Sequence, residues 1–232
     1  MPVTEAIILA GGLGTRLRDA VPDLPKCMAP VNGHPFIAYV IKQLQSQGIS
    51  RFIFSLGYRS EAFTRFINET LPDGSYELVV EKEPLGTGGA IRFVMSHAVT
   101  EDIVVVNGDS IFASDIASQY DLHRQRKAAC TLALKPMKNF DRYGVVEMDP
   151  DQRIVHFREK QAYANGLING GVYIINKAQF TAISFPDKFS FETEYLQKYY
   201  KKEPIYGIEQ EGYFIDIGIP EDYQRAQKEL VY

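Results

Sequence analysis

The sequence predicts an α/β fold with a doubly wound, mostly parallel but mixed sheet, folded as a single domain over residues 1–232. Three observations support this prediction. Apolar runs of strand length alternate with helical segments through the first half, an order typical of parallel sheets covered on both faces. The hydrophobic fraction of 45% and the charged fraction of 23% are ordinary for a globular protein. No proline- or serine-rich linker and no internal repeat divides the chain.

In the first half, four apolar runs are predicted strands, and each gap between them contains a helical segment. The helix at 36–47 has Pro35 near its start and Gly48 just past its end, as helix boundaries prefer. The predicted strands are 6–10, 51–55, 77–80 and 103–106, and the other predicted helices are 60–70 and 88–99.

The second half is richer in β-structure and continues the same sheet. The expected arrangement is a nucleotide-binding half over about 1–115 and a second-substrate half over about 116–232, with a cleft between them. The predicted strands are 131–134, 144–148, 154–158, 172–175 and 214–217, and the predicted helices are 122–127, 191–200 and 222–230.

Charge and cysteine content exclude several classes of function. The net charge of −4 argues against a broad nucleic-acid-binding face, so an anion site must be built locally. Cys27 and Cys130 do not form a disulfide framework or a metal-binding motif. The N-terminus lacks a cationic signal region, and its apolar stretch ends at Gly11. We therefore expect a cytoplasmic protein without a membrane partner.

A glycine-rich turn after the first strand predicts a phosphate site. Gly11, Gly12 and Gly14 leave backbone N–H groups available, and Arg16 and Lys26 follow them. The turn lacks the Lys-Ser or Lys-Thr of a Walker phosphate-binding loop. Leu17 stands where the dinucleotide-binding motif has its third glycine, which argues against a nicotinamide or flavin site. A plain strand-to-helix turn would explain the glycines but not the two cations.

Two carboxylates are candidates for a magnesium site. Asp109 follows the apolar run 103–106, and Asp216 lies near the end of the run 214–217, each close to a glycine. Carboxylate oxygens are ligands that Mg²⁺ prefers. The alternative is two separate turns.

A second glycine-rich element, 83–90, is either a site for a flat ligand or a flexible loop that leads into a helix. Its glycines permit close backbone approach, and the helix that follows begins with unpaired N–H donors. Glu83 can accept hydrogen bonds from the N1 and N2 donors of guanine, or it can be a solvated surface acid.

Several polar residues of the second half suit a phosphorylated sugar. Lys160 can hold a phosphate as a point charge, and Glu159 can accept hydrogen bonds from hydroxyl groups. Asn169, followed by Gly170, offers both donors and an acceptor, and Gly144 permits close backbone approach. Mixed charge at a strand end is otherwise typical of a solvated surface.

Together these motifs resemble the sugar-1-phosphate nucleotidylyltransferases, the NDP-sugar pyrophosphorylases. The resemblance starts with Gly11-Gly12-Leu13-Gly14-Thr15-Arg16-Leu17 and Pro25-Lys26 and spans nearly the whole chain in order. It implies a Rossmann-like, GT-A-like nucleotidyltransferase fold. Within the family, the stretches 134–146, 167–173 and 214–223 are most similar to the D-glycero-α-D-manno-heptose 1-phosphate guanylyltransferases.

The resemblance implies a role for each motif residue. On the nucleotide side, Gly11 and Gly12 contact base and ribose, and Gly86 helps to recognise the base through its backbone. Arg16 and Lys26 are the implied catalytic cations, at the β- and γ-phosphates and at the α-phosphate respectively. The remaining nucleotide-side residues are Leu9, Gly14, Thr15, Glu83 and Thr87; the implied Mg²⁺ ligands are Asp109 and Asp216; and the sugar-phosphate residues are Gly144, Glu159, Lys160, Asn169 and Gly170.

The expected reaction converts GTP and D-glycero-α-D-manno-heptose 1-phosphate to GDP-heptose and pyrophosphate, with Mg²⁺ as cofactor, in nucleotide-sugar biosynthesis. Ile219 departs from the threonine of many hexose-1-phosphate relatives, which weakens an assignment to an ordinary hexose enzyme. Alternatives within the family are a mannose-1-phosphate guanylyltransferase or a uridylyl- or thymidylyltransferase. Other classes are a non-catalytic nucleotide-sugar regulator and an NAD-dependent oxidoreductase, the latter disfavoured by Leu17. A fused hexapeptide-repeat acyltransferase is not expected, and a homo-oligomer stays open.

Overall fold

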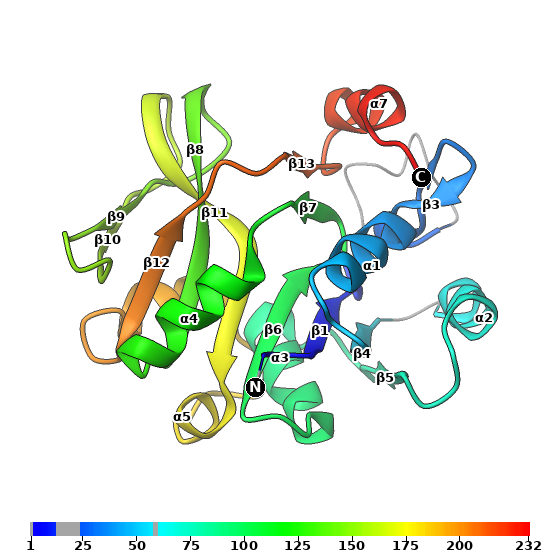
Figure 1. The fold of residues 1–232 in the computed structure, drawn as a ribbon, viewed down its shortest axis with the longest axis horizontal. Coiled ribbons are helices and arrows are strands. Elements are labelled where there is room, and N and C mark those ends of the chain that lie inside the picture. Colours follow the sequence, from blue (N-terminus) through cyan, green and yellow to red (C-terminus); the bar gives the residue numbers. More distant parts are fainter. Residues whose placement is uncertain (1, 13–23, 58–59) are drawn as a thin grey trace.

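A mixed sheet forms the centre of the protein in a computed structural model that describes residues 2–12, 24–57 and 60–232 (Figure 1). Its seven strands follow the order β12–β8–β11–β6–β1–β4–β5. Strands β5, β4, β1 and β6 run parallel, β11 is antiparallel to both of its neighbours, and β12 runs parallel to β8. The predicted α/β class is thus confirmed. The strands are β1 (Glu5–Leu9), β4 (Arg51–Leu56), β5 (Tyr76–Val80), β6 (Asp102–Asn107), β8 (Cys130–Phe140), β11 (Tyr163–Asn176) and β12 (Ile205–Glu209).

Helices cover both faces of this sheet and enclose two hydrophobic cores. Adjacent residues of β1 show the arrangement, because Ile8 packs into one core and Ile7 into the other. Burial on both faces explains why these strands read as continuous apolar runs. The helices are α1 (Phe36–Ser46), α2 (Glu61–Thr70), α3 (Gly86–Val94), α4 (Ile116–Arg126), α5 (Lys177–Thr181), α6 (Gln197–Tyr199), α7 (Pro220–Glu229), the 3₁₀ turns η2 (Lys26–Met28) and η3 (Met95–His97), and the π-helical η4 (Phe191–Leu196).

Three short ladders lie outside the central sheet. β2 (Pro30–Val31) pairs with β3 (His34–Pro35), and β9 (Val146–Met148) pairs with β10 (Ile154–Phe157). The third ladder joins β7 (Ser110–Phe112) to β13 (Phe214–Asp216), with Asp216 opposite Ser110. This last pairing brings the C-terminal part of the chain to the end of β6.

Some element boundaries differ from the predicted ones. The helix predicted at 122–127 is the end of α4, which starts earlier because the Asp115 side chain caps it by accepting from the Ser118 amide. The strand predicted at 172–175 is the end of the 14-residue β11. The predicted helix 191–200 begins as the π-helical η4. β7, β12 and α5 were not predicted.

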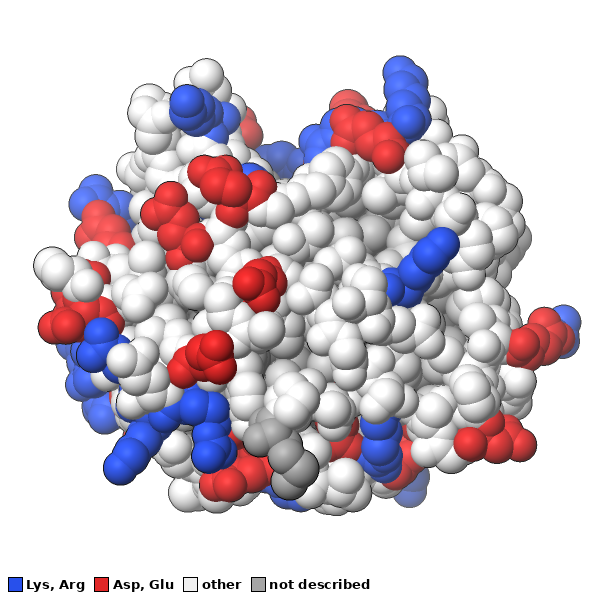
Figure 2. Space-filling model, in the orientation of Figure 1, with Lys and Arg blue, Asp and Glu red and all other residues white. Residues whose placement is uncertain are grey.

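The surface carries interspersed charges. On the face drawn in Figure 2, acidic and basic side chains of the described residues alternate around the rim, and no broad cationic patch forms there. The same view shows a notch between the outer ends of β8 and β11 and helix α7. None of the helices among the described residues is long and apolar enough to cross a membrane.

Candidate active site

The candidate site lies at the carboxyl ends of the parallel strands. Leu9 at the end of β1 is in register with Ser55 of β4 on one side and with Asn107 of β6 on the other. Gly11 and Gly12 follow directly after β1, so the predicted phosphate turn starts at this edge. Gly14, Thr15, Arg16 and Leu17 lie outside the described residues.

A cavity of about 590 Å³ opens at this edge next to the glycine turn. Lys26 lies in η2, after the glycine turn, and Asp109 follows β6; both residues line the cavity. Its walls include every nucleotide-side residue predicted from the sequence that the structure describes: Leu9, Gly11, Gly12, Glu83, Gly86 and Thr87.

Glu81 is a wall residue of this cavity that sequence reasoning missed. Its carboxylate accepts hydrogen bonds from the Ser55 hydroxyl at 2.8 Å and from the Leu85 amide at 3.1 Å. Gly11 lies close by, since a Cβ at Gly11 would be 3.5 Å from Glu81 Oε1. The two bonds fix the carboxylate toward the cavity, whereas the predicted Glu83 is exposed.

The glycines at the start of α3 serve packing more than ligand access. The Gly88 and Gly89 amides donate to the Phe189 carbonyl at 3.0 and 3.3 Å, which corrects the expectation that they are unpaired donors. A Cβ at Gly88 would lie 2.2 Å from Phe189 Cε2. Gly86 has φ +73° and abuts the same residue, so this turn is shaped to hold the segment around Phe189.

Lys26 and the two predicted metal ligands converge on one point. Lys26 Nζ lies 2.6 Å from Asp109 Oδ2 and 3.2 Å from Asp216 Oδ1. The β7–β13 ladder delivers Asp216, and the turn η2 delivers Lys26. Asp216 Oδ1 also accepts from the Gly218 amide at 2.8 Å, and Arg142 lies 3.6 Å from its Oδ2. The alternative of two separate turns is therefore wrong.

This carboxylate pair fits a hard divalent cation. Two carboxylate oxygens already converge on a positive charge, and oxygen is the donor atom that Mg²⁺ prefers. Within the described residues, no group of three His, Cys, Asp or Glu side chains forms a complete ligand set. A metal here would depend on phosphate oxygens and water for its remaining ligands, as is usual for Mg²⁺.

Cys27, next to Lys26, is an unreactive core residue. Burial, followed by the charge of Asp109, raises the pKa of the Cys27 thiol to about 12. The thiol therefore stays protonated at neutral pH and is a poor nucleophile.

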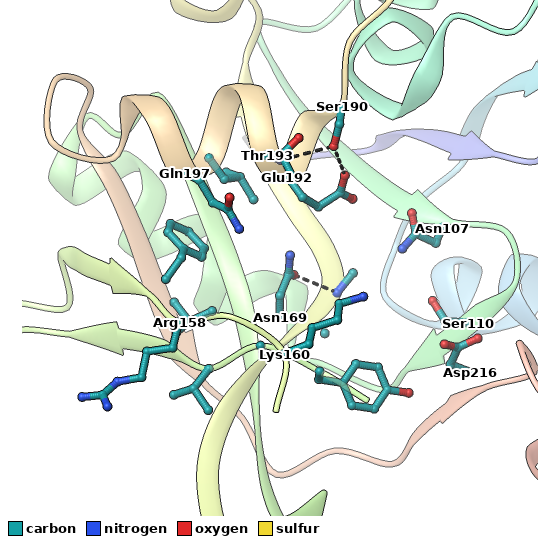
Figure 3. Close-up of a pocket in the computed structure, with 18 of the residues that line it drawn as sticks. Asn107, Ser110, Arg158, Lys160, Asn169, Ser190, Glu192, Thr193, Gln197 and Asp216 are labelled. Atoms are coloured by element: carbon teal, nitrogen blue, oxygen red, sulfur yellow. Dashed lines mark hydrogen bonds between the residues drawn. The ribbon is translucent and has the colours of Figure 1, made fainter. Parts of the chain in front are cut away.

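A second cavity, also of about 590 Å³, lies on the other side of the Lys26 cluster (Figure 3). In the close-up, Lys160 and Asn169 lie on one wall. Glu192, Thr193 and Gln197 lie on the opposite wall, which η4 and α6 form. Asp216 lies at one end. All five residues predicted to bind a sugar phosphate line this cavity: Gly144, Glu159, Lys160, Asn169 and Gly170.

Internal bonds hold the Asn169 amide in place. Its Nδ2 donates to the Tyr173 hydroxyl at 2.9 Å, and its Oδ1 accepts from the Gly171 amide at 3.1 Å. Both glycines of this group are required by packing, because a Cβ at Gly144 would lie 2.4 Å from the Arg158 carbonyl and one at Gly170 would lie 2.2 Å from Phe112.

Three residues line both cavities: Asn107, Asp109 and Glu192. Glu192 joins the two sides directly, since its carboxylate accepts from the Thr87 hydroxyl at 2.8 Å and from the Ser190 hydroxyl at 3.1 Å. This contact could not be predicted from the sequence, because Glu192 and Thr87 are 105 residues apart.

Comparisons with known proteins identify the family of the chain. The chain is 47% identical over 226 residues to the D-glycero-alpha-D-manno-heptose 1-phosphate guanylyltransferase of Aneurinibacillus thermoaerophilus, covering 97% of this chain and 98% of that protein. It is 42% identical over 219 residues to the protein of the same name from Campylobacter jejuni, covering 94% and 96%. The crystal structure of HddC from Yersinia pseudotuberculosis complexed with GMP-PN has a TM-score of 0.85 at 33% identity, covering 98% of this chain and 99% of that one. The family model described as Nucleotidyl transferase matches residues 5–231, and the chain belongs to this family.

Proposed function

We propose that this enzyme transfers the guanylyl group of GTP to D-glycero-α-D-manno-heptose 1-phosphate and releases pyrophosphate. One observation carries the proposal: two cavities of equal size meet at a cluster of one ammonium and two carboxylates. The names of the two relatives described above support the guanylyl group and the heptose. We assign the reaction to the cytoplasm, where GTP is available, and to nucleotide-sugar biosynthesis.

We assign the nucleotide to the cavity beside β1 and the sugar phosphate to the cavity beside β11. The first is lined largely by residues of the segment 1–115 and the second largely by residues of 116–232. The α-phosphorus and the sugar phosphate would then meet at Lys26 and Asp109.

The chemistry needs no general base, because the nucleophile is already a phosphate oxygen anion. That oxygen attacks the α-phosphorus, the bond to the bridging oxygen of the β-phosphate breaks, and pyrophosphate leaves with the electron pair. Catalysis then consists of positioning and charge stabilisation. Lys26 would stabilise the charge at the α-phosphate, and the resemblance to the family implies that Arg16, Gly14 and Thr15 would hold the β- and γ-phosphates.

Asp109 and Asp216 would hold Mg²⁺, with the Asp216 carboxylate kept in place by the Gly218 amide and by Arg142. When bound, the metal would supply positive charge to the phosphate oxygens and reduce their repulsion.

We assign reading of the guanine to Glu81, assisted by the backbone around Gly86. A carboxylate accepts at both oxygens and complements the adjacent N1–H and N2–H donors of guanine. The two bonds from Ser55 and Leu85 occupy one acceptor position on each oxygen and leave the other available.

We assign Lys160 to the sugar phosphate, and Glu159, Asn169, Gly144 and Gly170 to the sugar. The Lys160 side chain points into the cavity toward its Asp216 end (Figure 3), where the phosphate must lie for transfer. The Asn169 amide lies farther from that end and can bond to ring hydroxyls.

Pyrophosphate release over a matrix of nucleoside triphosphates and sugar 1-phosphates, with Mg²⁺, tests the proposal. We expect the highest kcat/KM with GTP and the manno-heptose 1-phosphate. A higher value with mannose 1-phosphate would replace the heptose assignment, and a higher value with UTP or dTTP would refute the guanylyl assignment. Binding without pyrophosphate release from any pair would identify a regulator instead of an enzyme.

A further inference from the structure

The ammonium of Lys26 occupies the point where the two proposed metal ligands converge. Its Nζ contacts Asp109 Oδ2 at 2.6 Å and Asp216 Oδ1 at 3.2 Å, and its side chain is only 13% exposed. These are the same carboxylates that would bind a divalent cation. A metal ion and an ammonium at hydrogen-bond distance from the same oxygens repel each other strongly.

We propose that Lys26 is the counter-ion of the metal-free site, and that a divalent cation displaces it toward the nucleotide cavity. Metal binding and delivery of the catalytic ammonium are then one event. This inference rests on the metal site of the proposed function and adds a competition between the metal and a residue of the chain.

The surroundings allow the side chain to move while its backbone stays fixed. The turn η2 is closed by bonds from the Met28 amide to the Pro25 carbonyl and from the Ala29 amide to the Lys26 carbonyl. Cys27 anchors it in the core, at 3% exposure. Lys26 already lines the nucleotide cavity, so its four-carbon stem can turn the ammonium into that space.

Asp216 keeps other partners when Lys26 leaves. The Gly218 amide holds Asp216 Oδ1 at 2.8 Å, and Arg142 lies 3.6 Å from Oδ2. A Cβ at Gly218 would lie 3.1 Å from Lys26 Nζ and 2.9 Å from Asp216 Oδ1, so the glycine keeps this side of the site open for a cation.

Binding of Mn²⁺ without nucleotide, measured by calorimetry or by the loss of the free Mn²⁺ EPR signal, tests the competition. Lys26→Met should bind Mn²⁺ about 10-fold or more tightly than the wild type, because the metal no longer displaces a bound cation. Lys82→Met is the matched control: Lys82 lines the same cavity but makes no ion pair with another described residue. It should change the affinity by less than about threefold. Equal or weaker binding by Lys26→Met overturns the inference.

A variant of the metal site separates failure of this inference from failure of the proposed function. Asp109→Asn should lose most Mn²⁺ affinity. If it keeps the wild-type affinity, the proposed metal site is wrong. If it loses affinity while Lys26→Met gains none, the metal site stands and the competition is wrong.

Amine labelling of the wild-type protein gives a result that does not depend on any variant folding. An acetylating reagent with mass-spectrometric detection should modify Lys26 faster after Mg²⁺ is added, because its ammonium leaves the ion pair. Lys82 serves as the internal reference. Unchanged or slower modification of Lys26 overturns the inference.

Discussion

Replacement of Glu81 by alanine should remove the preference for guanine while the fold survives. The wild-type carboxylate is held by the Ser55 hydroxyl and the Leu85 amide, and each of its oxygens keeps one acceptor position toward the cavity. In our assignment GTP would fill both positions with its N1–H and N2–H donors. ITP lacks the 2-amino group and fills only one, so the ratio of the two substrates isolates a single hydrogen bond.

The size of the effect follows from that one bond. A hydrogen bond to a charged group contributes about 1.5–3 kcal/mol, which corresponds to a factor of roughly 10 to 150 in kcat/KM. The wild type should prefer GTP over ITP by this factor. Glu81→Ala should bring the two substrates to within about threefold, since neither finds a carboxylate. Glu81→Gln should discriminate poorly, because its NH₂ group faces the donors of guanine.

Steady-state pyrophosphate release with GTP and ITP, at fixed sugar 1-phosphate, measures the ratio. Glu83→Ala is the matched control, because Glu83 lines the same cavity two residues further along the chain. An unchanged ratio in Glu81→Ala together with a lost ratio in Glu83→Ala would refute our assignment and restore the one made from the sequence.

Three further predictions concern catalysis, pH and packing. Lys26→Ala should lower kcat by about 10²–10³ with the circular dichroism spectrum unchanged; turnover within a few-fold of the wild type would contradict its role. Burial would raise the pKa of Asp102, but the nearby His123 ring and hydrogen bonds from Asn176 and Arg124 lower it from 3.8 to about 2. Ionised Asp102 therefore contributes on the order of 2 kcal/mol to the free energy of unfolding above pH 4, and this contribution is lost as the pH falls through 2. Urea unfolding should show the loss in the wild type but not in Asp102→Asn. If the stability of both proteins depends on pH in the same way, Asp102 does not make this contribution. Gly88→Ala should lower the free energy of unfolding by about 1–3 kcal/mol, because the new Cβ overlaps the Phe189 ring, and unchanged urea stability would refute this.

Most of the first half could be predicted because its strands are buried on both faces. The apolar run of β6, for example, predicts a buried strand without any knowledge of the fold. The second half gave weaker signals. The N-terminal part of β11, with residues such as Asn165, is exposed and polar, and β7 is three residues long and too short to show a period.

The candidate site was predictable wherever a residue follows a strand in a glycine-rich turn. Asp109 and Gly11 are of this kind. The position of Glu81 in the cavity wall was not predicted, because it depends on where β5 ends, and that strand ends at Val80. Glu192 could not be predicted for another reason: its partner Thr87 is distant in sequence and contacts it only in the tertiary fold.

The short β7–β13 ladder has a consequence for how the charge cluster forms during folding. Lys26 and Asp216 are 190 residues apart, and the pairing of β13 with β7 is what brings them together. A chain that grows from its N-terminus therefore cannot complete the charge cluster until residues 214–216 have been synthesised. Recovery of metal binding during refolding would therefore require the β7–β13 pairing, and a variant that weakens this pairing should slow that recovery.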